Sequence, residues 1–364
     1  MNENKNTDEK TPNNDMEQTS PQAERQTAEN RSAGRQLPPL TPARRMAEGA
    51  LMVALSTIFG MLTFYAPLLD ILLLIVYPIP IAFLIKRHNI STGLLAFAAS
   101  SLLLTLFLGI TNAAFVILSM GAVGIWYGIA WRKNIRPMRT VVIGTVLAAV
   151  SVAVTMLLSL WTMGVAAGNI TAYISQYVDE TVAALQSAGL FEMMAGGVSA
   201  AEYSKTMTDM LANLIPGMMI IAAMLEALLC YIISGAVFRR LGIDIKTLPK
   251  FRDWHLAWPA LWGLIIALLA YLGYHYLGYD WLKTIALNVI YIYYPILMVT
   301  GISLVIWFCK TTKSLFMPIV LIVGAVIFPG GIVLAVLMFG LFDAIVDFRS
   351  WFRKNAKNRP PNGI

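Results

Sequence analysis

The sequence predicts an all-α protein that crosses a lipid bilayer many times. Hydrophobic residues make up 58% of the 364 residues and charged residues only 13%, and the mean hydropathy is +0.67. The apolar residues also occur in long blocks, and about 20 such residues form a helix that spans the hydrocarbon layer. We therefore expect a polytopic helical bundle with eight secure spans and a C-terminal hairpin, eight to ten crossings in all.

The apolar blocks also predict the domain organisation. Residues 1–42 are polar and predict a disordered cytoplasmic tail, residues 43–348 form the transmembrane helical domain, and residues 349–364 form a basic cytoplasmic tail. The spans are expected at residues 47–65, 68–85, 92–109, 113–131, 140–163, 212–237, 257–275 and 284–308, followed by a last block at 315–346. This last block contains Phe328-Pro329-Gly330-Gly331, which predicts a break into two short limbs that either cross as a hairpin or re-enter.

Lysine and arginine residues predict the orientation of the spans, because short cytoplasmic loops carry an excess of both. They cluster in alternate connections, at Arg44 and Arg45, Lys86 and Arg87, Arg132 to Arg139, Arg239 to Arg252, Lys310 and Lys313, and Arg349 to Lys357. The connections on the opposite side contain almost none. Both termini are therefore expected in the cytoplasm, and the protein is expected to be a multi-pass protein of the cell membrane.

The segment at residues 164–210 is the long connection predicted on the extracytoplasmic side. Its apolar residues Ile174, Tyr177, Val178, Val182 and Leu185 recur at helical spacing, opposite the polar Ser175, Asp179 and Glu180. This pattern predicts amphipathic helices on the outer surface. Such helices either cap the bundle without a ligand role or form a lid over an outward-facing pocket.

No motif in the sequence predicts catalysis. A Walker A loop, an HExxH motif, a CxxC pair and a GxSxG motif are all missing from suitable contexts, so we expect no enzyme activity, no catalytic residue and no cofactor. His88, His255 and His275 lie far apart in sequence, which argues against a metal site. The net charge of +7 comes from clusters between apolar blocks, which argues against nucleic-acid binding.

Glu226 is the most informative polar residue in a predicted span, because it lies about 20 Å from Arg239 along the helix and cannot reach water. An ionised carboxylate is costly there, which leaves two interpretations. Glu226 either binds a ligand or a proton, or it fastens two helices as a neutral hydrogen-bonded acid.

A second polar group lies in the predicted span at 284–308. Asn288 and Tyr291 share one helical face with Pro295, which frees the carbonyl of Tyr291, and Tyr294 lies deeper than an interfacial aromatic belt. Together with Glu226, these residues are our candidate ligand-binding residues.

Three other acidic residues lie near the cytoplasmic ends of the predicted helices. Glu48, Asp343 and Asp347 have neighbouring arginines, and ion pairs with Arg44, Arg45, Arg349 or Arg353 account for them without a transport role. A contribution to docking a cytoplasmic partner stays open.

Two stretches resemble the substrate-binding S components of energy-coupling factor transporters. Glu48-Gly-Ala-Leu-Met-Val-Ala-Leu-Ser56 carries Ala50 and Ala54 four residues apart, similar to the small-residue face with which S components meet their coupling subunit. Tyr77-Pro-Ile-Pro-Ile-Ala-Phe-Leu84, followed by Lys86-Arg-His88 and Gly93, resembles the proline-containing second span and the glycine-opened third span of that superfamily. S components have fewer spans than are expected here.

The whole core resembles the YybS-like (DUF2232) family of uncharacterised Gram-positive membrane proteins, whose C-terminus is similar to Gly340-Leu-Phe-Asp-Ala-Ile-Val-Asp-Phe-Arg349. The remote similarity to S components implies transporter-like binding of a small solute. It also implies that Ala50 and Ala54 contact a transmembrane coupling subunit, and that separate ATPase subunits hydrolyse ATP. The alternative is a non-transporting membrane scaffold or regulator that docks cytoplasmic partners through its two tails.

Overall fold

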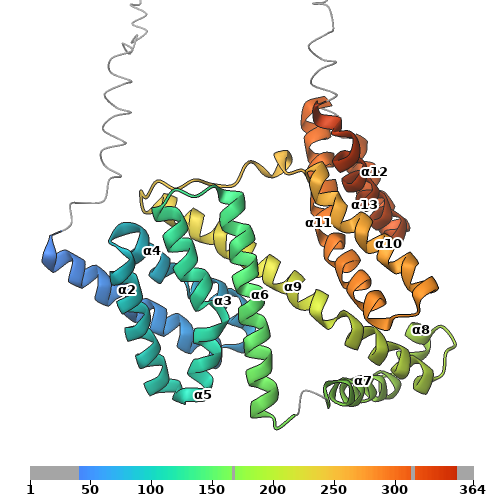
Figure 1. Ribbon diagram of the computed structural model, residues 1–364, viewed down its shortest axis with the longest axis horizontal. Coiled ribbons are helices and arrows are strands. Elements are labelled where there is room, and N and C mark those ends of the chain that lie inside the picture. Colours follow the sequence, from blue (N-terminus) through green and yellow to red (C-terminus); the bar gives the residue numbers. More distant parts are fainter. Residues whose placement is uncertain (1–40, 166–168, 313–315, 351–364) are drawn as a thin grey trace, which may run out of the picture.

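The computed structural model describes residues 41–165, 169–312 and 316–350, and all regular structure in these ranges is helical. This confirms the predicted all-α fold. The predicted tails at 1–42 and 349–364 lie almost wholly outside the described residues. Figure 1 shows two groups of helices that pack beside different parts of one long helix, α9 (Ala200–Arg240).

The N-terminal group surrounds the C-terminal part of α9. It consists of α2 (Pro42–Tyr65), a short 3-10 turn (Pro67–Leu69), α3 (Asp70–Val76), α4 (Ile79–Arg87), α5 (Ile90–Arg132) and α6 (Pro137–Thr162). Its hydrophobic core is formed by α4, both limbs of α5 and the residues of α9 from Ala223 to Phe238. Within this core, the rings of Tyr127, Trp131 and Tyr231 contact one another.

Helix α5 reverses direction at Gly109, where φ is 77° and ψ is 164°. These angles are open to glycine and unfavourable for other residues. The two limbs then run side by side, since a Cβ at Gly121 would lie 2.6 Å from the Phe97 ring. The limbs hold the spans predicted at 92–109 and 113–131, although the turn comes before the expected position at Thr111 and Asn112.

The span predicted at 68–85 is not one continuous helix. It is divided between α3 and α4 at Tyr77-Pro78, because proline lacks the N–H that would continue the hydrogen-bond ladder. Helix α4 is enclosed by its neighbours, and Ala82 and Ile85 are fully buried. Its close approach to α5 depends on small residues, since a Cβ at Gly124 would lie 2.6 Å from the Cβ of Pro78.

The C-terminal group packs beside the middle of α9. It contains α10 (Leu261–Leu277), α11 (Asp280–Thr312), α12 (Phe316–Ile327) and α13 (Pro329–Val346), preceded by the 3-10 turns Phe251–Asp253 and Trp258–Ala260. The break between α12 and α13 falls at Phe328-Pro329, as predicted. Helices α11 and α13 touch backbone to backbone, because a Cβ at Gly301 would lie only 2.0 Å from the Val336 carbonyl oxygen.

Seven helices in the described ranges are long and apolar enough to cross a membrane: α2, α5, α6, α9, α11, α13 and the segment Trp258–Leu277. Large apolar side chains such as Leu102, Leu106 and Trp161 are more than 70% exposed, as expected for surfaces that face lipid. The protein is thus a multi-pass helical membrane protein. The full number of crossings and the orientation stay predictions.

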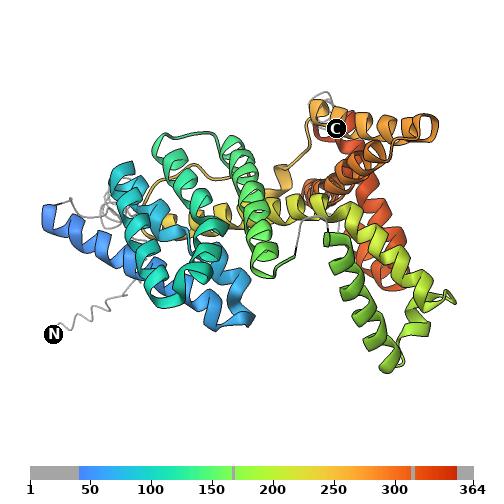
Figure 2. The ribbon, with the colours of Figure 1, turned by 60° about the horizontal axis from the view of Figure 1, so that its bottom comes forward.

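A separate small unit is formed by α7 (Ile170–Ser187), α8 (Phe191–Ala195) and the N-terminal part of α9. Helix α7 packs along this part of α9, and the short α8 lies in the connection between them. Figure 2 shows this unit beside the C-terminal group and away from α2 to α5.

Candidate functional site

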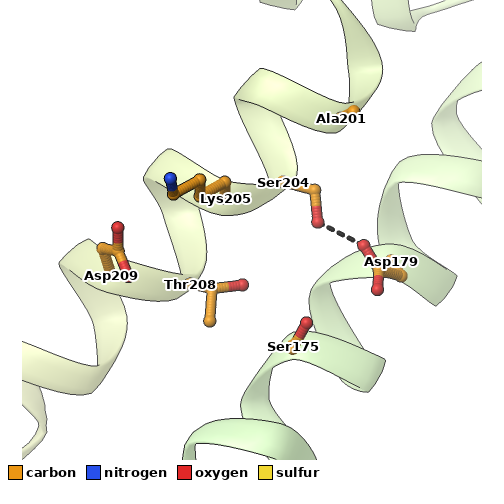
Figure 3. Close-up of a pocket in the computed structure, with 7 residues that line it drawn as sticks. All are labelled: Ser175, Asp179, Ala201, Ser204, Lys205, Thr208 and Asp209. Carbon is orange, nitrogen blue, oxygen red and sulfur yellow. Dashed lines mark hydrogen bonds between the residues drawn. The ribbon is translucent and has the colours of Figure 1, made fainter.

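A polar cavity of about 290 Å³ lies between α7 and the first turns of α9 (Figure 3). It is lined by Ser175, Asp179, Ala201, Ser204, Lys205, Thr208 and Asp209. The predicted extracytoplasmic segment supplies all seven residues.

The position of the cavity follows from the two faces of α7. Ile174, Val178 and Val182 are buried in a small apolar cluster with Phe191 and Ala195. Residues one position further along a helix are turned by about 100°, so Ser175 and Asp179 lie beside this cluster rather than opposite it. The predicted apolar stripe is confirmed at these three positions, whereas Tyr177 is 65% exposed and points away.

Helix α9 presents a matching set of polar residues. Its N-terminus is capped by Ser199, whose hydroxyl accepts a hydrogen bond from the Glu202 backbone N–H at 3.3 Å. The cap sets the start of the helix, and Ser204 and Thr208, four residues apart, then lie on one face. Both side chains point towards α7 in Figure 3, where Ser175 and Asp179 lie.

The hydroxyl groups of Ser204 and Thr208 differ in their hydrogen bonding. Ser204 donates a hydrogen bond to Asp179 across the cavity. Thr208 is only 6% exposed, and its hydroxyl has no hydrogen-bond partner among the described residues. Since an unpaired buried hydroxyl is costly, the Thr208 hydroxyl is available to a bound polar molecule.

The charged lining residues differ in direction. Asp179, Lys205 and Asp209 are all exposed, but the Asp179 carboxylate faces α9, whereas Lys205 and Asp209 extend away from α7 (Figure 3). The sequence marked Ser175 and Asp179 as polar but did not single out Ser204, Lys205 or Thr208. The signal for Ser204 and Thr208 was their four-residue spacing, which matches that of Ser175 and Asp179 on α7.

Glu226 lies elsewhere, in the core of the N-terminal group. Its Oε1 atom is buried without a hydrogen-bond partner among the described residues. The neighbouring carbonyl of Ala227 accepts a hydrogen bond from the Tyr127 hydroxyl at 2.7 Å. Both interpretations of Glu226, ligand or proton binding and helix fastening, stay predictions.

Asn288 joins α11 to α9 at the point where Pro216 interrupts α9. Its side-chain amide donates to the Asn213 carbonyl at 2.7 Å, and its amide oxygen accepts from the Gly217 N–H at 2.5 Å. Residues 213 and 217 are the pair that an undisturbed helix would join directly. The Asn288 amide therefore replaces one helical hydrogen bond of α9.

The remaining candidate ligand residues do not converge with Glu226. Asn288 contacts α9 about 14 Å along the axis from Glu226, since Gly217 precedes Glu226 by nine residues. Tyr294 is 45% exposed and Tyr291 partly buried. The neighbouring Tyr293 is the one that joins helices, because its hydroxyl donates to the Ala260 carbonyl before α10.

Ala50 and Ala54 are both exposed on α2. Nothing lies within 4 Å of the position that a Cβ at the adjacent Gly49 would occupy. The opposite face of α2 packs against α5, where Gly60 meets Leu104 and Val116. The two alanines thus lie on a face that is open to another molecule or to lipid.

Glu48 connects α2 to the end of α4. Its carboxylate accepts from Arg44 Nε at 2.9 Å, as the sequence predicted, and also from Arg87 Nε at 2.8 Å. His88 Nε2 lies 3.0 Å from the same carboxylate, and its side chain is 2% exposed. His88 therefore lies in one partly buried polar cluster with Glu48, Arg44 and Arg87.

Asp343 and Arg349 form a second buried ion pair at 3.1 Å, as the sequence predicted. Arg349 also donates to the Arg252 carbonyl at 2.6 Å and to the Trp254 carbonyl at 2.9 Å. Ser303 on α11 donates to the Phe251 carbonyl at 2.6 Å. Arg349, placed by the sequence at the start of the C-terminal tail, thus joins α13 to the 3-10 turn before α10.

In the described residues, no group of three or more His, Cys, Asp and Glu side chains could hold a metal ion.

Comparison with known proteins supports a membrane family. Residues 54–344 match the family described as "Predicted membrane protein (DUF2232)". The chain is also 26% identical over 278 residues to the "Uncharacterized protein YybS" of Bacillus subtilis (strain 168), covering 73% of this chain and 84% of that protein. No solved structure matches the chain, and the similarity to S components stays a prediction. The match extends from α2 into α13, and the chain therefore belongs to the DUF2232 family of predicted membrane proteins.

Proposed function

We propose that this protein is the solute-binding part of a transporter in the cell membrane and takes up a small polar solute from the extracytoplasmic side. The observation that carries the proposal is the cavity between α7 and α9, with its buried and unpaired Thr208 hydroxyl. A polar solute would give this hydroxyl the hydrogen bond that the described residues do not supply.

The length of α9 supports a position of the cavity outside the bilayer. Its 41 residues extend about 61 Å, roughly twice the thickness of the hydrocarbon layer. Arg239 and Arg240 end the helix, and basic residues favour the cytoplasmic side. The N-terminal turns of α9, which line the cavity, then project on the extracytoplasmic side.

The open face of α2 supports the second part of the proposal. Ala50 and Ala54 would let a helix of a transmembrane coupling subunit approach closely, as in S components. Separate ATPase subunits would supply the energy, because the sequence contains no phosphate-binding loop.

Solute binding can be tested with a variant that fills the cavity. Ala201 lines the cavity but is exposed, so Ala201→Trp should block the site without disturbing the core. Ala184→Trp, at an exposed position of α7 outside the cavity, is the matched control. We expect mass spectrometry to find a small molecule that co-purifies with the wild type and the control but is depleted in Ala201→Trp. Equal small-molecule content in all three proteins would contradict solute binding at this cavity.

The coupling partner can be tested by pull-down from native membranes. Ala50→Leu and Ala54→Leu should release a co-purifying membrane subunit and its ATPases, whereas Ala98→Leu, at an exposed position of α5, should retain them. A complex that is unaffected by both α2 changes would argue against this docking face. If deletion of residues 1–40 abolishes a cellular phenotype while solute uptake stays normal, the scaffold or regulator function would replace the transporter.

A further inference from the structure

We propose that the cavity between α7 and α9 selects a small organic cation, with the Asp179 carboxylate as its counter-charge and the Thr208 hydroxyl as an acceptor for its ammonium group. This inference rests on the proposed solute-binding function and names the chemical class of the solute. It depends on the charge inside the cavity, the unpaired hydroxyl and the charge of the surrounding segment.

The charge that the lining turns towards the cavity is negative, because the exposed Asp179 directs its carboxylate towards α9 (Figure 3). Asp179 accepts a hydrogen bond from Ser204, and a carboxylate has about four acceptor positions, so most of its capacity remains. Lys205 is the one cation among the lining residues. It lies four residues before Asp209, on the same side of α9, and extends away from α7 with it (Figure 3). The Lys205 ammonium group is thus directed away from the Asp179 carboxylate, which is left to a ligand.

The hydroxyl groups fit an ammonium group better than an anion. An ammonium group has three hydrogen-bond donors and no acceptor, and it can bind a carboxylate and two hydroxyl oxygens at once. Asp179, Thr208 and Ser175 offer this set of acceptors around one cavity. A carboxylate or phosphate in the same place would lie against Asp179 and be repelled.

The surrounding segment would attract cations from solution. Residues 164–210 contain five carboxylates, Asp179, Glu180, Glu192, Glu202 and Asp209, and one basic residue, Lys205. A cavity inside a negatively charged surface raises the local concentration of cations. Metal ions are less suited to it, because hydroxyl residues make up half of its six polar lining residues and no group of three or more His, Cys, Asp and Glu side chains in the described ranges could hold a metal ion.

The size of the cavity limits the solute to a compact molecule. A volume of 290 Å³ corresponds to about ten water molecules at liquid density. Ethanolamine, ethylene glycol and glycolate are three probes of similar size that are cationic, neutral and anionic.

The test is calorimetric titration of the full-length protein in lipid nanodiscs with each of the three probes. We expect ethanolamine to bind at least about tenfold more tightly than the other two, and Asp179→Asn to weaken its binding by about tenfold or more. Asparagine keeps an acceptor for Ser204, so the helices should stay packed, and the melting temperature checks this. Glu192→Gln, a change of an exposed acid that does not line the cavity, should leave binding unchanged.

Three results would overturn the inference: no ethanolamine binding, ethanolamine binding that Asp179→Asn leaves unchanged, or tighter binding of ethylene glycol or glycolate. If a probe of another charge binds and Ala201→Trp abolishes it, the cation class is wrong but the cavity is still a solute site. If the native protein yields no small molecule that depends on Ala201, the proposed function itself fails.

Discussion

At the scale of single residues, the polar groups inside the membrane domain mainly hold helices together. Asn288 satisfies two backbone groups of α9 that Pro216 would otherwise leave without partners. Asn288→Leu should therefore lower stability by about 2–4 kcal/mol, because each unsatisfied buried group costs about 1–3 kcal/mol. The thermal midpoint of the purified protein measures this. Asn169→Ala, at an exposed asparagine before α7 without a capping hydrogen bond, should change the midpoint little.

The Asp343–Arg349 pair gives a second prediction at this scale. Both side chains are at most 2% exposed, so Arg349→Met would leave a buried carboxylate without its cation. We expect a loss of about 3–5 kcal/mol, and partial recovery in the double variant Asp343→Asn/Arg349→Met. Arg252→Met removes a 3.9 Å pair between exposed side chains and should cost less than about 1 kcal/mol. Equal losses for the two arginines in thermal unfolding would contradict the assigned role of Arg349.

At the scale of helices, close packing depends on a few glycines. A Cβ at Gly301 would lie 2.0 Å from the Val336 carbonyl oxygen, so Gly301→Ala must push α11 and α13 apart. We expect a loss of about 1–3 kcal/mol, measured by denaturation in detergent. Gly49→Ala meets nothing within 4 Å and should be neutral or stabilise α2 by up to about 1 kcal/mol. A neutral Gly301→Ala would show that these helices do not touch at this point.

At the scale of the whole molecule, the basic clusters and the length of α9 predict how the protein is oriented in the membrane, with α7 on the extracytoplasmic side. In a background without Cys230 and Cys309, Gln186→Cys on α7 should react with a membrane-impermeant thiol reagent in intact cells. Lys133→Cys in the connection between α5 and α6 should react only after the cells are opened. Labelling of both positions only after opening would place α7 and the cavity in the cytoplasm.

The long helices could be predicted from the sequence because hydropathy and helix length are local properties. Gly109 and the break at Tyr77-Pro78 could be predicted less well, since both depend on how the chain turns against its neighbours. The cavity could not be predicted, because the polar spacing on α7 and on α9 becomes a site only when the two helices face each other. For the same reason the sequence indicated Asn288 as a ligand-binding residue. Its hydrogen bonds to α9 depend on how α11 packs against α9, which the sequence does not show.

The contact between Asn288 and α9 has a mechanical consequence. A helix interrupted by proline bends easily, but here an amide from α11 completes the missing turn. Contacts with α11 therefore stiffen α9 at Pro216. We expect α9 to keep its shape at this point only while α11 is packed against it. If α11 moved away, Pro216 would become a hinge. The cavity near the N-terminus of α9 would then rotate relative to the membrane-spanning part of the helix.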